Sequence, residues 1–260
     1  MRPLALTPAQ VTALRPLLEA LDAPRFVLIG AAALSVHVAL ERATEDIDLV
    51  FVASPDEYEP WFEQHGWHRS HRMVHRWILE DVFVDLLPAT DDVLRAGHVE
   101  FRDGAIMSTA GLDLVLAHAL RVPVATTELR IEVASLPALV VLKMAAWLDR
   151  PFEREKDLDD LMQVLRYALA DDADCRWDDT HAVGASGLDH ECQSAFYVGL
   201  EVGSVIAHAY VDLIGRFLAK AQNEDSSCFG RLAIAYRAFD DRAATMTRNT
   251  LRAFARGVRV

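Results

Sequence analysis

Three aspartates interrupt two apolar segments of the chain and could bind a metal ion together. Asp46 and Asp48 open the segment 46–52, and Asp85 is the only charged residue in the segment 82–87. Because side chains alternate along a strand, Asp46 and Asp48 would project from one face about 7 Å apart. Two carboxylates this close repel each other unless one is protonated or a cation binds between them. Mg²⁺ takes carboxylate oxygens together with substrate phosphates, so the pattern favours a magnesium site.

The Asp-x-Asp spacing alone is a weak signal. The chain has 24 Asp in 260 residues, and the pairs Asp157/Asp159 and Asp172/Asp174 have the same spacing. Composition predicts about two such pairs by chance. The first pair differs from the others because it opens a strongly apolar strand. The alternative interpretation of each site is a solvated aspartate at the end of a strand.

A short apolar strand at 25–29 is expected to run through Gly30 directly into an Ala- and Leu-rich helix that includes Ala31. A helix that begins at such a corner presents unpaired backbone N–H groups and the positive end of its dipole, where a phosphate can bind. Corners of this kind are common and are usually structural. Gly30 and Ala31 are therefore candidates for phosphate binding, and the rest of the site must decide between this role and a structural one.

Together these residues resemble the DNA polymerase β-like nucleotidyltransferase superfamily, and within it the minimal nucleotidyltransferases and the abortive-infection (AbiE-type) toxins. The similarity rests on Gly30-Ala31, on the run Arg42-x-Thr44-x-Asp46-Ile47-Asp48-Leu49, and on Asp85. A second similarity, to the K…R…K-D-x-x-D stretch of the toxin branch, lies in Lys143, Asp149-Arg150 and Lys156-Asp157-x-x-Asp160. The resemblance covers roughly residues 25–165.

The resemblance implies an in-line displacement at the α-phosphate of a nucleoside triphosphate. An acceptor hydroxyl attacks and pyrophosphate leaves, assisted by two Mg²⁺ or Mn²⁺ ions. By the resemblance, Asp46 and Asp48 would hold both ions. Asp85 would complete the ion near the acceptor hydroxyl and would be placed to take its proton. The acceptor expected from the toxin branch is RNA such as tRNA, with a cognate antitoxin as a further partner.

The resemblance also assigns residues to the nucleotide. The amides of Gly30 and Ala31 would meet the β- and γ-phosphates, although Ala31 stands where the family commonly has Gly or Ser and therefore offers no hydroxyl. Lys143 would neutralise the triphosphate, with a lysine that extends its apolar stem along an amphipathic helix as the alternative. Lys156 and Asp157 would lie on the nucleotide side or belong to an ordinary charged helix face.

Two other classes of function stay open. One is nucleotidylation of a small molecule or a protein instead of RNA. The other is a catalytically inactive nucleotide-binding module, which Ala31 favours. The sequence has no G-x-x-x-x-G-K-[ST], G-x-G-x-x-G, H-E-x-x-H or G-x-S-x-G motif, so the common sites with those signatures are excluded.

The elements that must position these residues change character along the chain. The order is mixed α/β to about residue 135 and helical afterwards, which predicts an α+β protein. We expect a mixed-sheet nucleotidyltransferase core at 1–135 and a helical domain at 136–260. The segment 170–190 is rich in Asp, Gly and Thr and is expected to be a mobile loop.

Local patterns give the expected element boundaries. Thr7-Pro8 and the capping box Ser54–Glu57 each open a helix. The expected strands are 25–29, 47–52, 73–79, 82–87 and 129–133, with a tight Glu80-Asp81 turn between the third and fourth. The further expected helices are 31–40, 111–121, 135–147, 153–169, 192–221 and 244–257.

Charge is distributed unevenly along the chain. The net charge is −13, yet residues 230–260 contain seven Arg and two Asp. The acidic balance weighs against a general nucleic-acid coat protein. Arg248, Arg252 and Arg256 recur at helical spacing and could guide an RNA acceptor. The alternative is a solvated face whose cations complement the helix C-terminus.

The apolar runs and the cysteines bear on the cellular compartment of the protein. The chain has no apolar run of the roughly 18 residues that a membrane span needs, and no apolar signal core near residue 1. Its three cysteines form no C-x-x-C pair. We therefore expect a cytoplasmic protein without a membrane partner.

Overall fold

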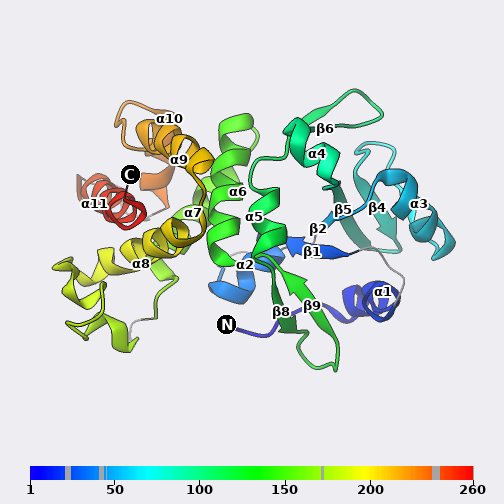
Figure 1. Cartoon of the computed structure of the whole chain (residues 1–260), viewed down its shortest axis with the longest axis horizontal. Coiled ribbons are helices and arrows are strands. Elements are labelled where there is room, and N and C mark those ends of the chain that lie inside the picture. The colour runs from blue at the N-terminus through cyan, green and yellow to red at the C-terminus, as the bar shows by residue number, and fades with distance from the viewer. Residues whose placement is uncertain (21–24, 41–43, 45, 171–172, 236–240, 260) are drawn as a thin grey trace. The chain divides into compact units, whose positions relative to one another are not determined.

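The computed structural model describes residues 1–20, 25–40, 44, 46–170, 173–235 and 241–259. The chain divides into two compact units, residues 1–139 and residues 140–260. A sheet with its helices forms the first unit and a group of helices forms the second, which confirms the α+β class (Figure 1).

Unit 1 is built on a seven-stranded mixed sheet in the order β3-β4-β5-β2-β1-β9-β8. The strands are β1 (Phe26–Ile29), β2 (Asp46–Phe51), β3 (His68–Arg69), β4 (Arg76–Leu79), β5 (Val82–Pro88), β8 (Leu120–Pro123) and β9 (Arg130–Val133). The pairs β2–β5 and β1–β9 are parallel and the other pairs are antiparallel. A separate two-stranded ribbon consists of β6 (His98–Glu100) and β7 (Ile106–Ser108).

Five helices accompany this sheet in the described part of unit 1: α1 (Pro8–Glu19), α2 (Gly30–His37), α3 (Pro55–Gln64), α4 (Asp91–Ala96) and α5 (Leu112–Ala117). Both expected helix starts are confirmed. Thr7 and Gln10 form a reciprocal capping box on α1, and Ser54 and Glu57 form one on α3. α3 buries Phe62 against Phe51 of β2 and Trp77 of β4, so it covers the face of the sheet opposite to the aspartates.

Unit 2 consists of helices, the first of which begins in the last residues of unit 1. They are α6 (Leu136–Asp149), α7 (Glu155–Tyr167), α8 (His190–Val205), α9 (His208–Ala221), α10 (Ser227–Ile234) and α11 (Asp241–Val258). Two 3₁₀ turns, Asp174–Arg176 and Gly184–Ser186, lie in the segment expected to be a mobile loop. Within that segment the guanidinium of buried Arg176 donates to the carbonyls of Leu169 and Ala170, which anchors the turn to the end of α7.

Helices α8 and α11 pack with their backbones in direct contact. A methyl group on Gly199 would lie 2.3 Å from the carbonyl oxygen of Phe254, and one on Gly257 would lie 2.3 Å from that of Phe196. Only a residue without a Cβ fits at such an approach. We call Gly199 and Gly257 the glycine seam.

Several boundaries differ from those expected. The helix expected at 111–121 ends at Ala117, and Leu120–Pro123 is instead the edge strand β8, because antiparallel pairing with β9 outweighs the local helical pattern. The strand expected from Met73 begins at Arg76, whose N–H closes a turn onto the Met73 carbonyl at 3.0 Å. The helix expected at 192–221 is interrupted at Ile206, which is extended. The two residues between the helices, Ile206 and Ala207, are apolar, so the hydrophobic pattern of the sequence continues across the break.

No helix in the described part of the chain has the length and apolar character needed to span a membrane.

Candidate active site

The three aspartates lie on neighbouring strands of the unit 1 sheet. Asp46 and Asp48 are on β2 and Asp85 is on β5, and the parallel register places Asp48 directly beside Asp85. Because register partners in a sheet project from the same face, all three carboxylates lie on one face. The side chain of Asp46 is 44% exposed, whereas that of Asp85 is 11% exposed. The cluster therefore runs from a buried carboxylate to one that solvent reaches.

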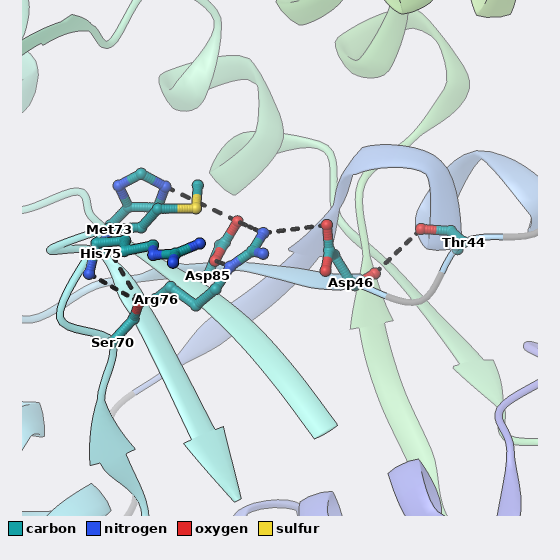
Figure 2. Close-up of polar contacts among 8 residues, drawn as sticks. Thr44, Asp46, Ser70, Met73, His75, Arg76 and Asp85 are labelled. Carbon is teal, nitrogen blue, oxygen red and sulfur yellow. Dashed lines mark hydrogen bonds and ion pairs between the residues drawn. The ribbon is translucent and has the colours of Figure 1, made fainter. Parts of the chain in front are cut away.

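Arg76 on β4 holds two of these carboxylates (Figure 2). It is the antiparallel register partner of Asp85. Its Nε and Nη2 donate to the two oxygens of Asp85 at 2.7 and 2.9 Å, and Nη2 lies 3.0 Å from Oδ2 of Asp46. The hydrogen bonds with Asp85 raise the pKa of the guanidinium, so it remains charged.

Sequence reasoning did not single out Arg76, although the signal was present. A tight turn at Glu80-Asp81 pairs Leu79 with Val82, and counting outward from that pair places Arg76 opposite Asp85. A cation opposite the one charge of an apolar strand is a favourable cross-strand pair. The register of a predicted hairpin can therefore locate a partner for a candidate site residue.

The donor set suits a hard divalent cation, because three carboxylates on one sheet face offer the oxygen ligands that Mg²⁺ and Mn²⁺ prefer. Among the residues that the structure describes, no three or more His, Cys, Asp or Glu side chains converge closely enough to hold a metal ion. Asp46 and Asp85 instead converge on the guanidinium of Arg76. The chemistry of the site fits a metal, and its present arrangement is built around an arginine.

The glycine corner lies against Asp48. α2 begins at Gly30, which has φ +70°, and a methyl group there would lie 2.0 Å from Oδ2 of Asp48. The N-cap residue Ile29 provides no side-chain hydrogen bond to the first turn of α2. Gly30 thus lets a helix N-terminus approach a carboxylate of the cluster closely, and Ala31 is buried next to it. Thr44 lies nearby and its hydroxyl donates to the Asp46 carbonyl at 3.2 Å, whereas Arg42 lies outside the described residues.

Gly30→Ala is expected to disturb this corner in two ways. A positive φ costs an alanine about 1–2 kcal/mol, and the added methyl group must also push the Asp48 carboxylate away. Gly97→Ala is the matched control, since Gly97 has φ +76° and no atom within 4 Å of an added Cβ. Urea unfolding should show a larger loss of stability for Gly30→Ala. Equal losses would mean that the contact with Asp48 has no energetic effect.

Lys143, Asp157 and Asp160 form a buried ion cluster within unit 2. Nζ of Lys143 on α6 donates to Asp157 at 2.8 Å and to Asp160 at 2.7 Å, both on α7. Burial alone would lower the pKa of Lys143, but the two carboxylates outweigh it and raise the pKa, so the ammonium stays charged. Oδ2 of Asp157 is buried and has no hydrogen-bond partner among the described residues.

The other residue expected on the nucleotide side, Lys156, is exposed in the first turn of α7. Sequence reasoning did not identify Asp157 and Asp160 as the partners of Lys143, although the helical spacing i, i+3 puts both on one face of α7. A triphosphate contact for Lys143, Lys156 and Asp157 remains a prediction.

Three solved structures are similar to this chain at low identity. The antibiotic-resistance factor ANT(2'')-Ia is 17% identical over 61% of this chain and 83% of its own, with a TM-score of 0.40. A candidate nucleotidyltransferase from H. pylori is 10% identical over 98% of both chains, with a TM-score of 0.40. An antigenic nucleotidyltransferase-like protein from Paracoccidioides brasiliensis is 13% identical over 60% of this chain and 74% of its own, with a TM-score of 0.41.

A search of curated proteins returned no match. A family profile, however, covers most of the chain: the family described as "Nucleotidyl transferase AbiEii toxin, Type IV TA system" matches residues 12–182. The match includes the aspartates of β2 and β5, the glycine corner and the ion cluster of Lys143. The chain therefore belongs to the AbiEii nucleotidyltransferase toxin family and is a nucleotidyltransferase.

Proposed function

We propose that this protein transfers a nucleotidyl group from a nucleoside triphosphate to a hydroxyl of an RNA such as tRNA, in the cytoplasm and with Mg²⁺ or Mn²⁺ bound. The observation that carries the proposal is the set of three carboxylates on one sheet face, beside a glycine corner, in a chain of this family. Family membership also supports a cognate antitoxin as partner.

In this proposal the site residues divide between the cations and the phosphates. Asp46, Asp48 and Asp85 would hold the cations, and Asp85 would also receive the proton of the attacking hydroxyl. The backbone N–H groups of Gly30 and Ala31 orient the β- and γ-phosphates at the start of α2. When bound, the cations stabilise charge on the attacking and leaving oxygens. Lys143 is proposed to neutralise the triphosphate.

Incubation with each α-³²P-labelled nucleoside triphosphate, total cellular RNA and Mg²⁺ or Mn²⁺ tests the proposal. We expect one or more of the four nucleotides to label RNA, with release of pyrophosphate. Label found on a protein or a small molecule instead of RNA would mean that the acceptor belongs to that class. Pyrophosphate release and labelling that are both absent with every acceptor would support an inactive nucleotide-binding module.

The arginines of α11 support an RNA acceptor. Leu251 and Phe254 are buried, so α11 turns its apolar side inward. Arg252 is exposed. The side chain of Arg248 is 30% exposed and lies 2.7 Å from Glu224. The Arg256 guanidinium lies 5.4 Å from the ring centre of Phe196. One face of the helix thus carries cations that phosphates could reach, in a chain whose net charge is −13.

Arg248→Glu combined with Arg252→Glu is expected to weaken RNA labelling about ten-fold, because each lost phosphate contact removes a salt-dependent contribution to binding. Binding of the nucleoside triphosphate alone should remain unchanged. Arg15→Glu with Arg95→Glu changes the net charge equally at exposed arginines of unit 1 and serves as the control. If both double variants label RNA equally well, the arginine face plays no part in acceptor binding.

A further inference from the structure

Arg76 occupies the place between two carboxylates to which the proposed function assigns a divalent cation. Both oxygens of Asp85 and one oxygen of Asp46 accept from its guanidinium or lie within 3.0 Å of it. The guanidinium spans from β4 across β5 to β2 and lies 5.7 Å from the ring centre of Phe83, the register partner of Asp46. Arg76 therefore uses the oxygens that a metal ion would need.

Two cations cannot share these oxygens without a cost. A guanidinium does not lose its proton in proteins, so its charge can leave the cluster only if the side chain moves. Bidentate pairing of Arg with a carboxylate is strong and fixes the orientation of both groups. Among the described residues Asp46 and Asp85 converge on this guanidinium, and no three carboxylates converge on a common metal position.

We propose that Arg76 is a built-in counter-cation, which holds Asp46 and Asp85 in the metal-free protein and is displaced when the divalent cation binds. The inference rests on the proposed function, since it concerns the same carboxylates. Arg76 acts through Asp46 and Asp85 and is a positioning residue. Its consequence is that part of the negative charge of the cluster is balanced without metal and that a metal ion binds only after overcoming this internal competitor.

Titration of chelator-treated protein with Mn²⁺, monitored by calorimetry, tests the proposal directly. Arg76→Gln should bind Mn²⁺ about ten-fold more tightly than the unmodified protein, because a competing charge next to the ion is gone. Without metal the variant should melt at a lower temperature, since the carboxylates have lost their counter-charge. Mn²⁺ should then raise its melting temperature by more than it raises that of the unmodified protein.

Two further variants sharpen the result. Arg76→Lys keeps one positive charge but lacks the planar fork that reaches both carboxylates, so an intermediate Mn²⁺ affinity is expected. Arg69→Gln is the matched control. Arg69 lies on the adjacent strand β3, pairs with Glu59, lies 5.2 Å from the ring centre of Trp77, and is 26% exposed against 19% for Arg76. Its loss should leave Mn²⁺ affinity unchanged.

Equal or weaker Mn²⁺ binding by Arg76→Gln, or no binding by either protein, would overturn the inference. Tighter binding also in Arg69→Gln would do so, because the effect would then be one of net charge. Asp48→Asn separates this inference from the proposed function. If Arg76→Gln tightens Mn²⁺ binding and the added change Asp48→Asn does not weaken it, the counter-cation role stands and Asp48 is not a ligand of the proposed catalytic site.

Discussion

Asp48→Asn is expected to lower nucleotidyl transfer about a thousandfold or more, because a neutral amide cannot replace a carboxylate where cations position the reacting oxygens. Asp48 lies between the glycine corner and Asp85, so its loss affects the centre of the cluster. The substitution nearly preserves the side-chain shape, and circular dichroism should show an intact fold. The rate of label incorporation from the preferred nucleoside triphosphate measures the effect.

Asp159→Asn provides the control for this experiment. Asp159 belongs to an Asp-x-Asp pair of the same spacing, but its carboxylate pairs with Arg231 inside unit 2. We expect the activity of this variant to stay within about two-fold of normal, as is usual for a partly exposed ion pair. A titration with Mg²⁺ should show a rise in melting temperature that Asp48→Asn removes and Asp159→Asn retains. Equal losses of activity in both variants would show that the Asp46/Asp48 pair of β2 has no distinct role in nucleotidyl transfer.

Gly257→Ala is expected to be the most destabilising of the substitutions considered, by about 3 kcal/mol, because an added methyl group forces two packed helices apart. It would meet the Phe196 carbonyl at 2.3 Å and the Gly199 Cα at 2.9 Å, and these backbone atoms cannot rotate away. Native-state amide exchange of α8 and α11 should accelerate accordingly, since it reports the local free energy of opening.

Gly215→Ala is the matched control for the glycine seam. Gly215 lies within α9, and no atom lies within 4 Å of an added Cβ there. The same substitution should stabilise α9 by about 0.5–1 kcal/mol, because alanine loses less backbone entropy than glycine in a helix. Similar exchange rates in Gly257→Ala and the unmodified protein would mean that α8 and α11 separate without cost.

The part of the fold that local physics dictates could be predicted from the sequence. Thr7 and Ser54 cap helices through hydrogen bonds to residues three positions away, so the pattern contains the full interaction. Strands β1, β2 and β5 are short apolar runs next to turn residues and were predicted for that reason. The Asp48–Asp85 pairing also follows once β2 and β5 lie parallel in register.

The rest depends on contacts between distant segments. Leu120 becomes a strand residue because β9 pairs with it, and nothing within 111–121 indicates this. The role of Gly199 and Gly257 depends on the approach of another helix, which single-residue propensity does not encode. Lys143 was predicted to face a triphosphate, and its carboxylate partners on α7 became evident only with the packing of α6 on α7.

The glycine seam also sets the order in which the chain can fold during synthesis. α8 finds its partner α11 only after a loop of about 60 residues has been made, and closing such a loop costs about 4 kcal/mol of chain entropy. At ribosomal speed the part of α8 that α11 covers, which includes Phe196, stays uncovered for about 3–10 s. All seven strands of the unit 1 sheet are synthesised before α8 begins. The sheet unit can therefore form while the helical unit still exposes an apolar face to chaperones.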